Sequence, residues 1–133
     1  MPVQMSWEDT SVGYGKILVT HYIGDWTLSE FETALSPFLT QVDRSRNCHV
    51  LIHDLSRQSH VPLELLPQTQ EMFVAEKPRF EVQILVGISA ATVALFHMFL
   101  QTVSQEIAQN FTIAETMEIA LLRAHQAVSA GDS

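Results

Sequence analysis

Residues 48–55, CHVLIHDL, decide the fold class of this chain. They form a short and nearly continuous apolar run after the polar residues 43–47, which is typical of a strand buried on both faces near the centre of a parallel sheet. Residues 16–23 and 80–88 are also rich in β-branched and other apolar side chains, so we expect strands there as well. Residues 111–114 are expected to form a short further strand.

Helical patterns alternate with these strands. Thr27 and Glu30 have the spacing of a capping box, which predicts a helix that begins at Leu28. Pro37 is expected to kink this helix or to restart it with Ser36 as the cap. Further helices are expected over residues 67–76, over residues 90–109 and after a cap at Thr116. Residues 3–7 are expected to pair with residues 16–23 as an edge hairpin.

The order of elements predicts an α/β protein with a single mixed, mainly parallel sheet and about four helices. The length of 133 residues predicts one domain. We expect its core to span residues 16–128, with residues 1–15 as an edge hairpin or arm and residues 130–133 as a flexible tail.

The charge balance excludes some classes of partner. The chain has 7 Lys and Arg against 15 Asp and Glu, a formal charge of -8, so it lacks the basic surface that nucleic acid or an anionic membrane requires. Cys48 is the only cysteine, and with no secretory leader in the sequence we expect a cytoplasmic protein. Residues 82–100 are uncharged and resemble a membrane span. Gly87 and Ser89 favour a strand, a turn and a new helix instead.

The element order, the residues HDLS at 53–56 and the closing segment FTIAETMEIALL at 111–122 resemble the STAS domain of bacterial anti-sigma factor antagonists and SpoIIAA-like proteins. The resemblance spans residues 16–128. It implies a regulatory domain that acts by protein contact and has no enzymatic activity. In the partner-switching members of the family, a serine in an Asp-Ser-Ser/Thr-Gly turn after this strand is phosphorylated.

The chain departs from the family at that turn. It reads SRQSHVPLELL at 56–66, with Ser59 near the expected position but without the preceding Asp or the Gly. By position alone, Asp54, Ser56, Ser59 and His60 are candidates for a phosphorylation or docking loop over residues 54–62. The alternative is that Ser59 only caps a turn before Pro62.

The polar residues do not predict a catalytic or metal site. His49 and His53 lie on one face of the central strand, but four residues of strand span about 13 Å, which is too far for two ligands of one metal. His53, Asp54 and Ser56 include each residue type of a catalytic triad, yet neighbours along a strand point in opposite directions. No Gly-x-Ser-x-Gly elbow is present. We therefore expect no enzyme activity, no cofactor and no metal.

The helix over residues 90–109 has a second apolar stripe formed by Leu95, Met98 and Phe99. Either a neighbouring helix covers this stripe or it is an exposed interface. An exposed stripe predicts a homodimer built on this helix.

The sequence thus predicts a regulatory domain that binds a protein partner near residues 54–62. The alternative is a carrier that holds a small, lipid-like apolar ligand between the sheet and the helix at residues 90–109, as a CRAL-TRIO resemblance of SpoIIAA-like proteins suggests.

Overall fold

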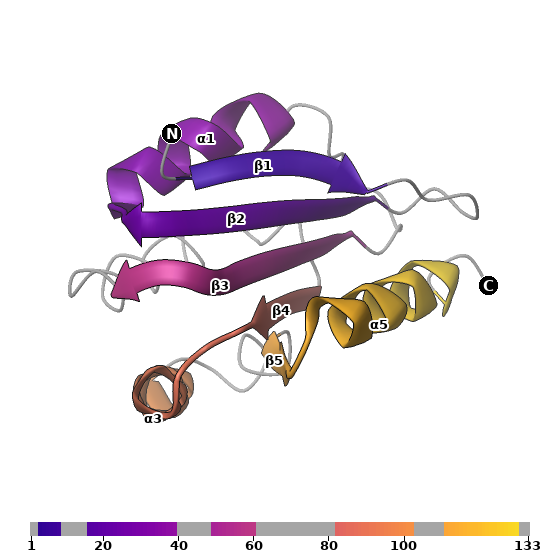
Figure 1. Cartoon of the computed structure of the whole chain (residues 1–133). Coiled ribbons are helices and arrows are strands. Elements are labelled where there is room, and N and C mark those ends of the chain that lie inside the picture. The colour runs from indigo at the N-terminus through magenta and orange to yellow at the C-terminus, as the bar shows by residue number, and fades with distance from the viewer. Residues whose placement is uncertain (1–2, 9–15, 40–48, 61–81, 103–110, 131–133) are drawn as a thin grey trace.

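A computed structural model of the chain describes residues 3–8, 16–39, 49–60, 82–102 and 111–130. Within these ranges the chain forms a five-stranded sheet and three helices (Figure 1). The strands are β1 (Val3–Glu8), β2 (Ile17–Asp25), β3 (Val50–His60), β4 (Val82–Val86) and β5 (Phe111–Ala114). The helices are α1 (Leu28–Leu39), α3 (Ala90–Thr102) and α5 (Met117–Ala130).

The strands lie in the order β1-β2-β3-β4-β5. β1 is antiparallel to β2, and the pairs β2–β3, β3–β4 and β4–β5 are parallel. The predicted α/β class, the mixed and mainly parallel sheet and the edge hairpin are therefore confirmed. The apolar strand predicted to be central, β3, is the middle strand of the five.

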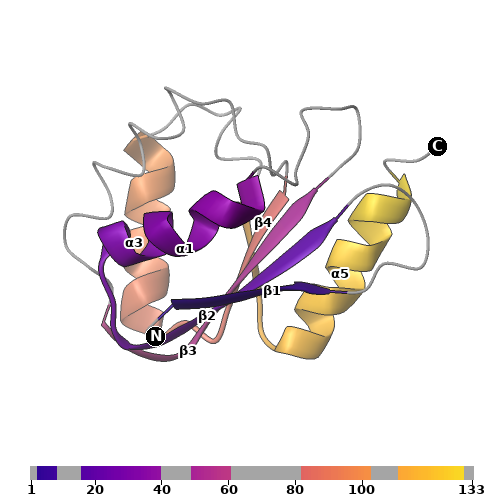
Figure 2. The ribbon, with the colours of Figure 1, turned by 90° about the horizontal axis from the view of Figure 1, so that it is seen from above.

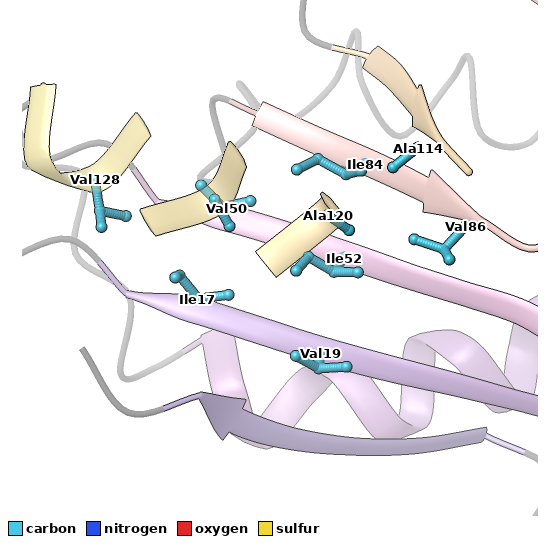
Figure 3. Close-up of a cluster of buried hydrophobic side chains, with 10 residues drawn as sticks. Ile17, Val19, Val50, Ile52, Ile84, Val86, Ala114, Ala120 and Val128 are labelled. Atoms are coloured by element: carbon cyan, nitrogen blue, oxygen red, sulfur yellow. The ribbon is translucent and has the colours of Figure 1, made fainter. Parts of the chain in front are cut away.

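Helix α5 covers one face of the sheet, and α1 and α3 lie on the other (Figure 2). The α5 face carries the largest cluster of buried side chains, in which small residues of the helix pack on β-branched residues of the strands (Figure 3). Ala120 and Ala124 are fully buried there, so the helix backbone approaches the sheet closely. The strand residues of this cluster are Ile17, Val19, Val50, Ile52, Ile84, Val86 and Ala114.

The opposite face packs under α1. Leu18 and Leu51 of the sheet meet Leu35 of the helix, and nearer the helix start Tyr22 lies 4.4 Å from Trp26 between ring centroids. Because side chains alternate along a strand, each strand residue belongs to one of these two faces. Each polar side chain on a strand therefore lies either on the α5 face or on the α1 face.

The start of α1 agrees with the sequence. The Thr27 amide donates to Glu30 Oε1 at 3.2 Å, and the Glu30 amide donates to Thr27 Oγ1 at 3.1 Å, which confirms the capping box. The helix continues through Pro37 to Leu39, so the predicted restart at Ser36 is wrong. Pro37 lacks the backbone N–H that would bond the carbonyl of Thr33, so the helix loses one bond here and ends two residues later.

Three expected segments differ from the structure or lie outside it. Residues 82–100 form β4, a turn and α3, which rules out one continuous span there. Among the described residues, no helix has the length and apolar character needed to cross a membrane. The helix expected over residues 67–76 falls outside the described ranges, as do residues 103–110 and the tail at 131–133.

Candidate functional site

The carboxyl edge of the sheet carries a projecting ribbon of two strands. β4 ends at Val86, opposite Asp54 of β3, and β1 begins opposite Tyr22 of β2. β2 and β3 nevertheless stay paired with each other as far as Asp25 and His60. Among the described residues, this parallel ribbon therefore extends beyond both of its neighbours, as the long arrow of β3 shows in Figure 1.

A β-bulge marks the start of the ribbon. His21 pairs with Asp54, and the next pair is Ile23 with Arg57. One residue of β2 therefore lies opposite two residues of β3, at positions 55–56. A bulge re-aims the side chains that follow it, and here it returns Arg57 to the same face of the sheet as Asp54.

The Asp54 carboxylate holds the bulge in place. Its Oδ1 accepts a hydrogen bond from the Ser56 amide at 3.1 Å and one from the Ser56 hydroxyl at 2.6 Å. Its Oδ2 accepts from His21 Nδ1 at 2.8 Å. Burial raises the pKa of Asp54, but the bonds from Ser56 and His21 outweigh it and lower the pKa below its usual value. The carboxylate is therefore ionised, with both oxygens engaged.

Gly87, in the turn that follows β4, packs against the bulge. Its φ is +73°, and a Cβ at this position would lie 2.7 Å from Cβ of Ser56. Other residues disfavour this φ, and none has room here for its Cβ. The chain thus turns out of β4 directly against the bulged residue.

The outer part of this cluster is accessible. Ser56 is exposed, and the His21 and Asp54 side chains are 43% and 15% exposed. The arrangement is not a catalytic triad, because the carboxylate lies between the other two side chains and the Ser56 hydroxyl donates to it rather than to a histidine. It presents the Ser56 hydroxyl oxygen in a fixed position beside an ionised Asp54 carboxylate whose two oxygens already accept hydrogen bonds. Both groups are suited to binding a partner.

A second polar cluster lies on the α1 face, in the middle of the sheet. His53 is bonded to the Tyr22 hydroxyl through Nδ1 at 2.7 Å and to Gln83 Oε1 through Nε2 at 2.8 Å. Since the amide oxygen only accepts, Nε2 carries the proton and Tyr22 donates to Nδ1. Burial lowers the pKa of His53 to about 4, although the bond to Gln83 opposes that shift. Burial also raises the pKa of Tyr22, so this cluster is uncharged at neutral pH.

Comparison with known proteins identifies the fold. No family model matches the chain, and no curated protein does. Among solved structures, the chain is similar to an uncharacterised protein of the DUF3478 family from Shewanella loihica PV-4, described as having a SpoIIAA-like fold. The likeness covers 92% of this chain and 93% of that one, with a TM-score of 0.65 and 13% identity. The chain has a SpoIIAA-like fold. This confirms the fold that the sequence resemblance implied.

Within this SpoIIAA-like fold, the predicted site is only partly a loop region. Asp54 and Ser56 are brought together as predicted. Residues 54–60, however, belong to strand β3. The loop predicted over residues 54–62 is therefore wrong for residues 54–60. Polar residues continue the strand because β2 pairs with them. The turn before Pro62 that Ser59 is predicted to cap lies outside the described residues. The side chains of Ser59 and His60 lie outside the described part of the structure.

The predicted interface on α3 is described only in part. Met98 is 61% exposed, whereas the side chains of Leu95 and Phe99 lie outside the described residues. Phe96 anchors the helix through an edge-on contact with Phe111 of β5, at 5.5 Å between ring centroids.

The sequence reasoning missed two residues of the SpoIIAA-like carboxyl edge. Strand alternation places His21 on the same face as Val19, and this pattern can be read from the sequence. Its pairing with Asp54 cannot, because that contact joins two different strands. Gly87 was interpreted as a turn residue, and its close approach to Ser56 was not foreseen. Within the described residues, no group of three or more His, Cys, Asp or Glu side chains could hold a metal ion.

Proposed function

We propose that this SpoIIAA-like domain is a regulatory module without enzymatic activity that docks a protein partner on its carboxyl edge. The observation that carries the proposal is the bulge at residues 55–56, whose exposed Ser56 hydroxyl is held 2.6 Å from Asp54 Oδ1. Preorganised polar groups on a rigid strand bind with a small loss of conformational freedom. The single cysteine suits the reducing cytoplasm, where we place this activity.

The chemistry of the cluster supports binding over catalysis. A carboxylate with a lowered pKa is a weak base, so Asp54 does little to activate the Ser56 hydroxyl as a nucleophile. His21 donates to the opposite oxygen of the carboxylate and is bonded to it rather than to Ser56.

Phosphorylation of Ser56 or Ser59 is the regulatory step that we propose for this edge. For Ser56, a phosphate of about -1.5 to -2 charge would replace the hydroxyl that now donates to the ionised Asp54. Repulsion would break that bond and move the bulge, so modification would weaken docking.

Self-association through α3 is the assembly that we propose. Met98 is an exposed apolar side chain on this helix, and large exposed apolar side chains are favoured at interfaces. In a symmetric dimer, the same surface of both copies would meet.

The carrier alternative is less well supported. A ligand on the α1 face would meet the polar cluster of Tyr22, His53 and Gln83 at the middle of the sheet. A purely apolar ligand gains nothing from such groups and would have to desolvate them.

The test is native mass spectrometry of the tagged chain purified gently from its own cells. The chain should carry a protein partner, and the partner should be lost from Ser56→Trp and Arg57→Trp, each checked for folding by circular dichroism. Leu122→Trp is the matched control, because Leu122 is 60% exposed and lies on α5 rather than on β3. Equal partner retention by all variants contradicts the proposal, and a retained apolar molecule in place of a partner supports the carrier.

A further inference from the structure

The hydrogen bond between His21 and Asp54 leaves one ring nitrogen of the histidine unused. Nδ1 of His21 lies 2.8 Å from Asp54 Oδ2. An ionised carboxylate can only accept, so Nδ1 carries the proton. In the neutral imidazole the other nitrogen, Nε2, then holds a lone pair. Among the described residues, no group is bonded to Nε2.

This nitrogen lies on the accessible part of the ring. The His21 side chain is 43% exposed, and strand side chains stand roughly perpendicular to the sheet. The tip of the ring, which includes Nε2, therefore points away from the backbone. The neighbours of His21 across the sheet are Gln4 of β1, which is exposed, and Asp54 of β3. Nε2 is open to a molecule that approaches this part of the sheet.

Three kinds of chemistry use an unprotonated imidazole nitrogen. A metal site needs further ligands, and the described residues hold no group of three or more His, Cys, Asp or Glu side chains suited to a metal. A general base needs a hydroxyl beside it, but the Ser56 hydroxyl donates to Asp54 at 2.6 Å. A nucleophile needs access and a third group that orients it. His21 meets this last requirement, because Asp54 fixes its ring.

Arg57 adds a cation on the same side of the sheet. It is exposed and pairs with Ile23, two residues beyond His21 on β2. The bulge places Arg57 on the face of His21, so the two residues are diagonal neighbours, about 7–8 Å apart. An arginine side chain reaches that far, and its guanidinium binds phosphoryl oxygens through parallel N–H bonds. The pair can therefore offer a nucleophile to a phosphorus atom and hydrogen bonds to its oxygens.

We propose that His21 is a phosphoryl acceptor, modified on Nε2 by a donor with a P–N bond such as a phosphohistidine of another protein. The Nε2 lone pair attacks phosphorus, and the new N–P bond forms as the donor's P–N bond breaks. The leaving nitrogen keeps that electron pair. Nε2 carries no proton, so none has to be removed, and the ring becomes a cation whose Nδ1–H stays bonded to Asp54.

Exchange of a phosphoryl group between two nitrogens keeps the type of bond, so the transfer needs no other energy source. Repulsion between the donor and Asp54 is limited, because both carboxylate oxygens already accept hydrogen bonds from Ser56 and His21. This modification site goes beyond the proposed docking function and does not depend on phosphorylation of a serine.

The experiment treats the full chain with phosphoramidate, the smallest P–N donor, from which ammonia leaves. Peptide mass spectrometry should find a phosphate on His21 that is labile in acid and stable in alkali, unlike a phosphoserine. His97 is the matched control, because it is exposed on α3 and no described carboxylate pairs with it. His21 should react at least about tenfold faster than His97, as expected for one hydrogen bond to a charged group.

The position of the phosphate on the ring separates this role from a merely structural one. Phosphorus–nitrogen couplings in NMR spectra of the labelled chain should place it on Nε2 alone, because Nδ1 is bonded to Asp54. Asp54→Ala should give a mixture of the two isomers. Arg57→Gln should slow the reaction roughly threefold, as expected for loss of an exposed ion pair, whereas Arg123→Gln on α5 should leave the rate unchanged.

The unsubstituted chain decides the outcome even where a variant fails to fold. If His21 does not react, reacts no faster than His97 or is modified on both nitrogens, the proposal is overturned. Partner co-purification tests the docking function separately, so either proposal can fail without the other.

Discussion

Gly87 and Ser56 approach so closely that a Cβ on Gly87 would lie 2.7 Å from Cβ of Ser56. This contact joins the end of β4 to the bulge of β3, and it fixes where the sheet stops and the two-stranded ribbon begins. The geometry of the candidate site therefore depends on a residue without a side chain.

Replacing Gly87 by Ala should destabilise the fold by about 2–4 kcal/mol, because strain at a φ of +73° adds to a steric clash with Ser56. Gly24→Ala is the matched control. Gly24 has a φ of +64° but open space around its Cβ position, so only the conformational cost of about 1 kcal/mol applies. Urea denaturation of both variants measures the difference, and equal losses would show that the contact with Ser56 is unimportant.

Asp54 and Ser56 should be energetically coupled. Two hydrogen bonds join the Asp54 carboxylate to Ser56, and Ser56→Ala removes the shorter one. A double-mutant cycle with Asp54→Ala and Ser56→Ala should give a coupling free energy of about 1 kcal/mol in unfolding experiments. Additive effects of the two substitutions would mean that the hydroxyl bond contributes nothing to the bulge.

The lowered pKa of His53 predicts that the protein loses stability in mild acid. Its folded pKa of about 4 lies below the ordinary 6.5, so the unfolded chain takes up a proton that the folded chain excludes. The contribution of neutral His53 to the free energy of unfolding is complete above pH 6.5 and is lost as the pH falls toward 4. At 1.36 kcal/mol for each unit of pKa shift, the loss reaches up to roughly 3 kcal/mol.

Unfolding free energies measured between pH 7 and pH 4.5 test this window. His53→Gln should remove the decrease in unfolding free energy that His53 causes between pH 6.5 and pH 4.5. The lowered pKa of Asp54 acts at lower pH, because its contribution is lost only below the ordinary carboxyl value of 3.8. An unchanged slope in His53→Gln would show that another group titrates.

Met98 tests the assembly proposed through α3. Met98→Glu places a charge on an exposed apolar position, so it should convert a dimer into a folded monomer. Leu122→Glu is the control, since Leu122 is equally exposed on α5. Sedimentation velocity measures both, and a dimer that survives Met98→Glu contradicts the α3 interface.

The sequence predicted those parts of the fold that depend on local patterns. The run at residues 48–55 gave β3 its central position, and Thr27 with Glu30 gave the start of α1. The extension of β3 to His60 could not be predicted, because Ser56 and Arg57 have no apolar alternation and become strand residues only by pairing with β2. The bond between His21 and Asp54 is likewise a contact between residues far apart in the chain.

The most direct measurement of the central claim is site-specific photo-crosslinking in the cells that make this protein. A photoreactive amino acid at position 57 should give a discrete covalent adduct with a partner protein, and the same probe at position 122 should give none. Asp54→Ala in the same chain should reduce the adduct at position 57, because it releases the bulge. Equal adducts at both positions, or none at position 57, would contradict docking at the carboxyl edge.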